Sequence, residues 1–172
     1  MEGIEYVVLV NDNDMPLGTM EKMEAHERGK LHRAFSVFIF NKKGEMMLQR
    51  RALEKYHSPG LWTNTVCSHP HPGENILDAA HRRMMEEMGF DCELKEIFSF
   101  KYKANVGGGL TEHEFDHVFI GTTDKKPNPN PEEVSEWKYM SMNDVMEDIR
   151  NNPQNYTEWF KIAIKELKTH VK

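Results

Sequence analysis

The sequence predicts a single mixed α/β domain. Apolar segments with the length and composition of strands alternate along the chain with segments that have helical spacing and caps, a pattern typical of α/β proteins. The chain has 172 residues, which is enough for one domain with a substantial core. It has no internal repeat and no linker long enough to divide it, so we expect one domain over residues 1–172.

The first part of the chain predicts three strands and a short helix. The elements are a strand at 4–10, a helix at 19–28, and strands at 34–41 and 45–51. Asn-Asp-Asn-Asp stops the first strand, and Lys42-Lys43-Gly44 predicts the hairpin turn between the last two. We expect Thr19 to cap the helix and Gly29 to end it, because these residue types satisfy the free backbone groups at helix ends.

The central part predicts a strand, a loop and a helix in succession. Residues 62–69 have strand character, and Cys67 and His69 lie two apart, so they point to the same face. Prolines and a glycine at 70–73 then force a loop. Residues 74–88 predict a helix that ends at Gly89. On this helix Arg83 and Glu87 lie one turn apart and share a face, as do Arg82 and Glu86.

Each of these residues also has a purely structural interpretation. Arg83 with Glu87 could be a surface ion pair, as most such pairs are. Cys67 could be a small buried apolar residue, and His69 a strand-end histidine with an ordinary hydrogen bond. Their concentration beside a helix rich in Glu and Arg is what indicates a site.

The rest of the chain predicts three strands and two helices. They are paired strands at 93–104 and 112–123, a Pro- and Asn-rich loop at 124–133, a strand at 134–140, and helices at 141–150 and 157–169 capped by Ser141 and Thr157. In the second strand Glu112, Glu114 and Asp116 fall on one face. Three acids on one face repel each other unless water or a cation surrounds them, so both a solvent-exposed face and a cation site are possible.

Composition limits the classes of partner. Charged residues make up 29% of the chain and hydrophobic residues 38%, an ordinary mixture for a globular protein. The net charge of −6 disfavours nucleic acid, although a local cluster of Lys and Arg can still bind a small phosphorylated ligand. Two cysteines, no signal peptide and no membrane-spanning apolar run predict a cytoplasmic protein. We expect a monomer or a weak homo-oligomer.

Several potential metal ligands are spread over three regions of the chain. They are three histidines and two glutamates, His26, His32, His69, Glu112 and Glu114. Mixed nitrogen and oxygen ligation of this kind suits Mn²⁺ or Mg²⁺, with Zn²⁺ also possible. The sequence does not itself bring these residues together.

Several uncommon strings occur in one order: LHRAFS at 31–36, RRAL at 50–53, TNTVCSHP at 63–70, GEN at 73–75, RRMMEEMG at 82–89 and EHE at 112–114. With these strings in this order, the chain closely resembles the type 1 isopentenyl-diphosphate isomerase family. The resemblance implies a Nudix-like α/β/α sandwich with a mixed sheet. The spacing of the Nudix box is present, but Ser68 stands where the box has Gly and Arg83 where it has Glu. The missing Glu weakens the case for diphosphate hydrolysis.

The resemblance implies a role for each matching residue. His26, His32, His69, Glu112 and Glu114 match the ligands of a divalent metal, Mn²⁺ or Mg²⁺ and possibly Zn²⁺, and Glu87 matches a residue that meets a Mg²⁺ brought by the substrate diphosphate. Lys22, Arg51, Lys55 and Arg83 match a cationic clamp on that diphosphate, and Trp159 matches an aromatic lid over the hydrocarbon tail. Cys67 and Glu114 match the proton carriers, with Tyr102 beside Glu114.

The implied activity is the reversible interconversion of isopentenyl diphosphate and dimethylallyl diphosphate through a tertiary carbocation. We expect Glu114 to protonate the terminal carbon and Cys67 to remove a proton from the opposite face. Two alternatives remain at this point, a Nudix-type diphosphate hydrolase and a non-catalytic metal-binding module. Phosphate release from a panel of diphosphates would identify the first, and absence of turnover with Mg²⁺ would favour the second.

Overall fold

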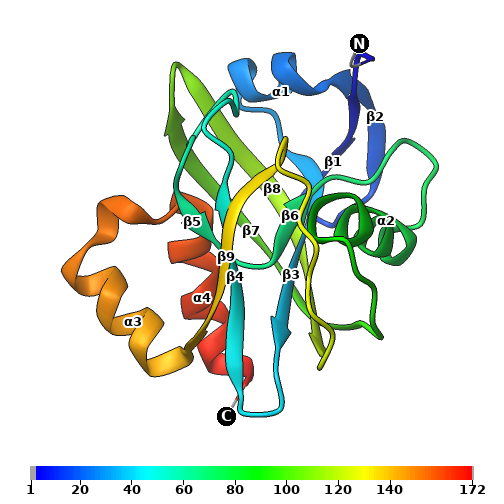
Figure 1. Cartoon of the computed structure of the whole chain (residues 1–172). Coiled ribbons are helices and arrows are strands. Elements are labelled where there is room, and N and C mark those ends of the chain that lie inside the picture. Colours follow the sequence, from blue (N-terminus) through cyan, green and yellow to red (C-terminus); the bar gives the residue numbers. More distant parts are fainter. Residues whose placement is uncertain (1–2, 172) are drawn as a thin grey trace.

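The computed structural model describes residues 3–171, so residues 1–2 and 172 of the predicted domain lie outside it. The described chain forms one mixed sheet of nine strands with four α-helices around it (Figure 1). In chain order the elements are β1 (Tyr6–Val10), β2 (Pro16–Glu21), α1 (Lys22–Arg28), β3 (His32–Phe40), β4 (Glu45–Arg51), β5 (Trp62–Thr63), β6 (Val66–Ser68), α2 (Ile76–Met88), β7 (Lys95–Gly107), β8 (Leu110–Thr122), β9 (Val134–Ser141), α3 (Met142–Asn151), η1 (Pro153–Asn155) and α4 (Glu158–His170). None of the described helices is long and apolar enough to cross a membrane.

Strand β3 lies at the centre of the sheet. It runs parallel to β8 and antiparallel to β1, β4 and β6. Both of its faces are covered, because Val37 and Ile39 belong to one buried cluster and Phe38 and Phe40 to another. A strand that is covered on both sides needs apolar residues at successive positions, which explains its almost continuous apolar run.

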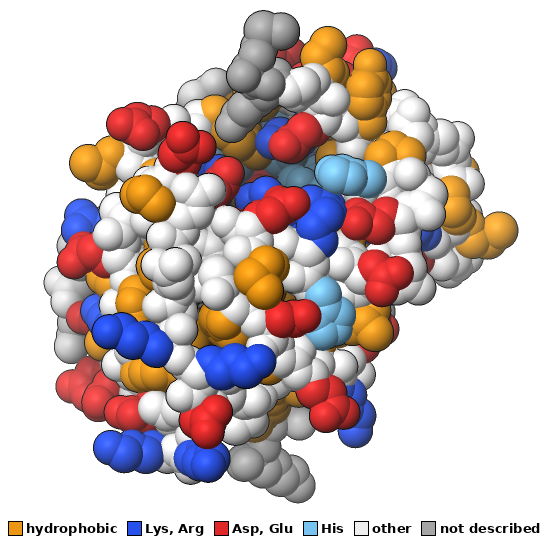
Figure 2. Space-filling view, turned by 45° about the vertical axis from the view of Figure 1, so that its right-hand side comes forward, with side chains coloured by type: hydrophobic (Ala, Val, Ile, Leu, Met, Phe, Trp, Pro, Cys, Tyr) orange, Lys and Arg blue, Asp and Glu red, His pale blue; other side chains and the backbone are white. Residues whose placement is uncertain are grey.

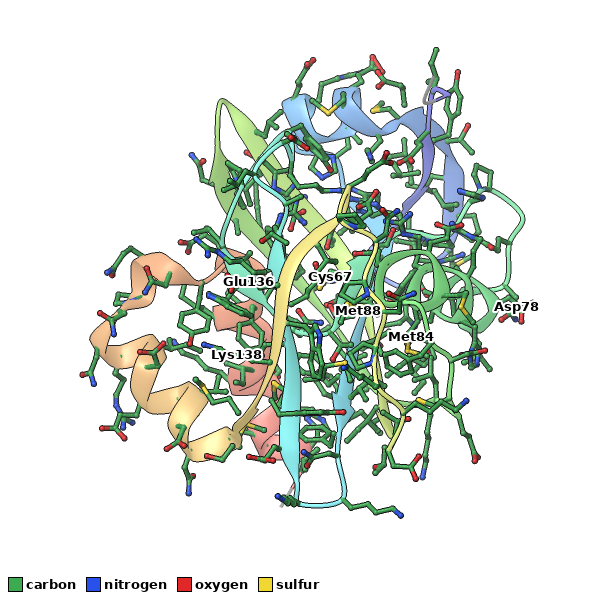
Figure 3. The ribbon with its side chains drawn as sticks, viewed as in Figure 1. Cys67, Asp78, Met84, Met88, Glu136 and Lys138 are labelled. Atoms are coloured by element: carbon green, nitrogen blue, oxygen red, sulfur yellow. The ribbon has the colours of Figure 1, made fainter. Side chains whose placement is uncertain are left out.

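Helices cover the two faces of the sheet. Helix α2 packs against one face through Ala79, Ala80, Met84 and Met88, and α4 packs against the other face through Phe160, Ala163, Ile164 and Leu167. Met84 and Met88 lie on the side of α2 toward the sheet, whereas the exposed Asp78 lies on its outer side (Figure 3). This is the predicted α/β/α arrangement.

The prediction for residues 19–28 was wrong at its start. Thr19 does not cap a helix but pairs with Val8 in the antiparallel β1–β2 hairpin. Helix α1 begins at Lys22, and the side chain of Glu21 accepts a hydrogen bond from the Met23 N–H as its N-cap. The predicted end is confirmed, because Gly29 has a φ of 64°, which favours glycine.

The predicted strand at 62–69 is in fact two short strands with different partners. Strand β5 pairs with β4, whereas β6 pairs with β3. The buried residues Asn64 and Thr65 lie between them. Asn64 Nδ2 donates hydrogen bonds to the carbonyls of Val37 and Val66, and the Thr65 hydroxyl donates to the Met47 carbonyl. These side chains form hydrogen bonds with backbone carbonyls beside the break, and so stabilise the chain where it leaves β4 and joins β3.

The other helix ends lie close to the predicted ones. Helix α2 begins at Ile76, two residues later than predicted, because the Asn75 side chain caps it by accepting hydrogen bonds from the N–H groups of Leu77 and Asp78. Glu74, just before the cap, forms an ion pair with Arg82 at 2.8 Å. Gly89 ends α2 with a φ of 68°. Ser141 and Thr157 cap α3 and α4 through their hydroxyl groups, as predicted.

Candidate active site and metal centre

A cleft of about 120 Å³ opens between α1, the β4–β5 loop, α2 and the start of α4. Figure 2 shows acidic, basic and histidine side chains gathered around a hollow on this face of the molecule. Ten of the residues predicted from the sequence line the cleft, Lys22, Arg51, Lys55, Cys67, His69, Arg83, Glu87, Glu112, Glu114 and Trp159. The remaining three, His26, His32 and Tyr102, are buried and contact the lining carboxylates from behind.

The register of the sheet brings the predicted metal ligands together. Glu112 and Glu114 point to one face of β8 and are only 6% and 5% exposed, so they do not form a solvent-exposed acidic face. His32 on β3 is directly paired with Glu114, and its Nε2 lies 3.1 Å from Glu114 Oε2. His69, which follows β6, places its Nε2 2.9 Å from the same oxygen. Helix α1 places His26 Nε2 3.6 Å from Glu112 Oε2.

Hydrogen bonds at the other ring nitrogens determine what these histidines present to the site. His32 Nδ1 donates to the Lys30 carbonyl at 2.8 Å, and His26 Nδ1 donates to the Lys22 carbonyl at 2.7 Å. In a neutral ring the Nε2 atom then carries a lone pair and no hydrogen. His32 Nε2 faces Glu114 Oε2 at 3.1 Å, and a proton or a cation must lie between these two atoms.

The donor set fits a divalent metal ion. One ligand atom from each of His26, His32, His69 and Glu114 lies within 4.8 Å of the others. His26 Nε2 is buried and has no hydrogen-bond partner among the described residues, which is typical of a site where an ion belongs. Histidines that bind metals usually donate their second ring N–H to a carbonyl, as His26 and His32 do here. Imidazole and carboxylate donors suit Mn²⁺, Mg²⁺ and Zn²⁺, so the geometry does not select the ion.

Tyr102 links the two carboxylates of β8. It lies directly across from Glu114 in the β7–β8 pairing, and its hydroxyl donates to Glu112 Oε1 at 2.8 Å and also contacts Glu114 Oε1. Burial by itself raises the pKa of the Glu114 carboxyl, but the hydrogen bonds with His32 and His69 outweigh it and hold this pKa well below its usual value. Burial and the neighbouring Glu114 raise the pKa of Glu112 instead.

The Cys67 thiol lies on β6, opposite Ser36 of β3. Its S–H donates to Asn64 Oδ1 at 2.9 Å, and the Trp159 indole N–H donates to its sulfur at 3.1 Å. The Ser36 hydroxyl lies 3.6 Å from the sulfur and donates to the buried Asp116 at 2.7 Å. Burial raises the pKa of the Cys67 thiol well above its usual range, so at neutral pH the group holds its proton.

Four cations from separate elements line the opposite side of the cleft, and three of them are paired with acids. Lys22 pairs with Glu5 at 2.6 Å, and Lys55 pairs with Glu133 at 2.7 Å. Arg83 on α2 contacts Glu87 at 3.1 Å and Glu133 at 3.3 Å.

Arg51 differs from the other three cations. Its guanidinium lies 5.1 Å from the centre of the Trp159 ring, and its Nη2 donates to the His57 carbonyl at 3.2 Å. Its Nε is buried and lacks a hydrogen-bond partner among the described residues. The guanidinium N–H groups of Arg51 can therefore bind an anion, and the same anion can replace the acids that now pair with Lys22, Lys55 and Arg83.

Sequence reasoning missed several residues of this cleft. Asn64 was treated only as part of a strand, Glu133 only as the end of a loop, and His57 was assigned no role. The sequence contained a partial signal for His57, because it follows the basic cluster of Arg50, Arg51 and Lys55 in a short loop. No local pattern indicated that its ring would turn inward, where it is 5% exposed.

Comparisons with known sequences agree with this geometry. The NUDIX domain profile matches residues 30–160. Isopentenyl-diphosphate Delta-isomerase 2 of Aromatoleum aromaticum is 52% identical over 163 residues, which cover 95% of this chain and 86% of that protein. Isopentenyl-diphosphate Delta-isomerase of Pectobacterium atrosepticum is 50% identical over 161 residues, which cover 94% of this chain and 90% of that protein.

Solved structures share the fold at low sequence identity. The crystal structure of DR0079 from Deinococcus radiodurans aligns with a TM-score of 0.79 at 18% identity, covering 94% of this chain and 98% of that one. A MutT NUDIX hydrolase from Burkholderia pseudomallei aligns with a TM-score of 0.63 at 18% identity, covering 83% and 98%. At this identity the likeness concerns the fold alone and confirms the Nudix-like architecture.

Proposed function

The chain belongs to the isopentenyl-diphosphate Delta-isomerase family and carries the NUDIX domain, and from this premise we propose how its cleft isomerises an isoprenoid diphosphate. The function predicted from the sequence is thereby confirmed. The observation that carries the proposal is that Cys67 and Glu114 line one cleft and stand on β6 and β8, which flank the two sides of β3.

The diphosphate binds at the cationic side of the cleft. Several fixed cations are needed to offset its charge, and an Arg guanidinium can contact two phosphate oxygens at once. Lys22, Arg51, Lys55 and Arg83 supply these charges once the diphosphate has displaced Glu5 and Glu133 from them. Glu87 is buried and lies beside Arg83, which suits it to hold a Mg²⁺ that arrives with the diphosphate.

The hydrocarbon tail then lies between the two proton carriers. One proton is added to the terminal alkene carbon, giving a tertiary carbocation, and another is removed from the carbon nearer the diphosphate, so the atoms balance. Tyr102 and Glu114 share the proton that is added, because their side chains contact each other. Cys67 takes the proton that leaves, and it does so as a thiolate, so the proton that its buried thiol holds in the substrate-free cleft must first be released. Because the reaction is reversible, each group acts as an acid in one direction and as a base in the other.

Two contacts assist the Cys67 sulfur as its charge changes. The Trp159 N–H points at the sulfur, so it stabilises a thiolate, and the S–H of the resting thiol is held by Asn64. The Trp159 ring is only 3% exposed and its face can stabilise the carbocation by about 2 kcal/mol when water is excluded. This is a small part of the roughly 8 kcal/mol or more that an enzyme supplies, so placement of the acid and base matters more.

His26, His32, His69, Glu112 and Glu114 would hold the divalent ion. When bound, the ion supplies positive charge that fixes the Glu114 carboxylate and alters its acidity. The second oxygen of that carboxylate stays next to the Tyr102 hydroxyl, where the proton is exchanged.

The position of Arg83 argues against a hydrolase. Its guanidinium contacts both Glu86 and Glu87, at 2.7 and 3.1 Å. In the Nudix box a third acid stands at this position, and the metals that hydrolysis requires use the acids of this helix. A cation here instead favours binding of the diphosphate without cleavage.

The test is proton NMR of isopentenyl diphosphate in deuterated water with the pure protein and Mg²⁺. We expect dimethylallyl diphosphate to form with deuterium at the exchanged carbons, and no phosphate to be released. Cys67→Ala should lower kcat by about a thousandfold, within the usual range for loss of a proton carrier. Cys92→Ala is the matched control, since Cys92 lies outside the cleft. Normal turnover by Cys67→Ala would remove the thiol from the mechanism.

A further inference from the structure

His57 is a buried residue in the cleft that neither the sequence resemblance nor the proposed chemistry uses. It lies in the loop between β4 and β5. Its ring packs edge-on against Trp159, with the ring centroids 5.4 Å apart, and is stacked beside the His26 ring, with the centroids 5.8 Å apart. Its Nδ1 faces the Ser58 hydroxyl at 3.3 Å, which leaves Nε2 as the atom that points toward the carboxylates.

His57 Nε2 belongs to a second group of potential ligands. Glu112 Oε2 lies 3.6 Å from His57 Nε2 and also 3.6 Å from His26 Nε2. These separations are longer than a hydrogen bond but similar to the distance between two atoms that share one metal ion, which lie about 2.0–2.2 Å from it. One ligand atom from each of His26, His57 and Glu112 lies within 4.8 Å of the others.

A second observation points to an ion at this place. His26 is 0% exposed, and its Nε2 has no hydrogen-bond partner among the described residues. The same nitrogen belongs both to this group and to the group with His32, His69 and Glu114. An ion beside His26 Nε2 is therefore faced by His32, His69 and Glu114 on one side and by Glu112 and His57 on the other.

We propose that His57 is a further protein ligand of the divalent ion, additional to the three histidines and two glutamates that the resemblance supplies. The inference rests on the metal centre described under the proposed function but does not depend on the isomerase chemistry. His57 would be the fourth imidazole that binds the ion, and it comes from a loop and not from the sheet.

This ligand connects the metal centre to the cations that bind the diphosphate. The His57 carbonyl accepts a hydrogen bond from Arg51 at 3.2 Å, and Lys55 lies two residues earlier in the same loop. A metal bond at His57 would hold this loop against β8. The ion would then fix the positions of residues that bind the diphosphate as well as those that transfer protons.

The test measures metal binding without substrate. Mn²⁺ affinity is measured by calorimetry for the wild type, His57→Ala, His57→Phe and His57→Asp, with circular dichroism as a check on folding. His57→Phe keeps a ring against Trp159 but cannot bind metal, whereas His57→Asp restores a ligand atom. We expect His57→Ala and His57→Phe to lose at least about tenfold in affinity and His57→Asp to recover part of it. His81→Ala is the control, because His81 pairs with Asp91 away from the cleft.

A spectroscopic measurement separates ligation from packing. Long-range ¹H–¹⁵N spectra of the protein with and without Zn²⁺ should show a shift of His57 Nε2 on metal addition. Unchanged His57 shifts, or an affinity of His57→Phe equal to that of the wild type, would overturn the assignment. That result would leave the isomerase proposal standing, whereas absence of turnover in the wild type with normal metal binding would overturn only the proposed function.

Discussion

The two sides of the cleft are built differently. On the histidine side, the carboxylates of Glu112 and Glu114 belong to a central strand, and the pairing of β8 with β3 and β7 fixes their distances to His32 and Tyr102. On the cationic side, Lys22, Lys55 and Arg83 come from α1, a loop and α2, and all three contact acids. The metal and the proton relay proposed for the first side need fixed geometry, whereas the diphosphate proposed for the second side needs charges whose present partners can be displaced.

The two sides of the cleft also differ in how their charges are balanced. Although burial opposes it, the pKa of Glu133 is lowered by Lys55 and Arg83, so this acid is ionised and neutralises the cations. On the histidine side, burial and Glu114 raise the pKa of Asp116 well above its usual value. The cationic side thus contains satisfied ion pairs, while the histidine side contains more negative charge than its surroundings can solvate. This excess is what a bound cation would relieve.

The largest expected effect is on the histidine side. Glu114→Gln should lower kcat by about a thousandfold, because it removes both a proton carrier and a negative ligand. The affinity for inorganic pyrophosphate, measured by calorimetry, should change little if the two sides act separately. Glu93→Gln, at an exposed position, is the control. A Glu114→Gln protein that turns over normally would contradict the assigned role.

Arg83→Ala should affect binding more than chemistry. Loss of a charge-assisted contact costs about 1.5–3 kcal/mol, so we expect KM to rise roughly 10- to 100-fold with kcat nearly unchanged. Steady-state kinetics measure both, and Arg150→Ala at the exposed end of α3 serves as the control. An unchanged KM would count against the clamp.

Glu133→Gln should change binding in the opposite direction. Because Glu133 pairs with both Lys55 and Arg83, its neutralisation leaves these cations free for the diphosphate. We expect pyrophosphate affinity to rise about fivefold, the order of magnitude of a partly buried ion pair. The exposed neighbour Glu132 supplies the control variant Glu132→Gln. Weaker binding by Glu133→Gln would show instead that Glu133 helps to hold the ligand.

The smallest effect concerns the stability of the metal-free protein. Since the folded-state pKa of Asp116 is raised above its unfolded value near 3.8, the native protein holds this proton more readily than the unfolded chain. The contribution of Asp116 to wild-type stability therefore falls as pH rises from 3.8 toward its folded-state pKa. Asp116→Asn cannot ionise, so with chelator present it should be more stable at pH 7 by about 1 kcal/mol.

Denaturant titrations at several pH values test this prediction. The difference between Asp116→Asn and the wild type should shrink as pH falls below 3.8, where Asp116 is protonated in both states. Asp124→Asn, at an exposed position, should show no such dependence. An advantage that stayed constant with pH would assign the effect to packing instead.

Local patterns predicted most of the elements because their causes are local. The caps at Ser141, Thr157 and Gly29 satisfy nearby backbone groups. Strand β3 is predicted by its apolar run, which it needs because both of its faces are covered. The errors fell where a distant partner decided the outcome. Residues 16–21 extend because they pair with β1, and the chain breaks at Asn64 because its side chain bonds to β3.

The sequence by itself determined the family and the activity class, because several uncommon strings occur in one order, and the resemblance that they carry supplied nearly all of the candidate site. Only the tertiary structure brought His26, His32, His69 and Glu114 within reach of one another and turned His57 inward. Strand pairing and burial depend on residues that are far apart in the chain, and no local spacing records them. The acids that hold the cations, Glu5 and Glu133, were likewise visible only after folding.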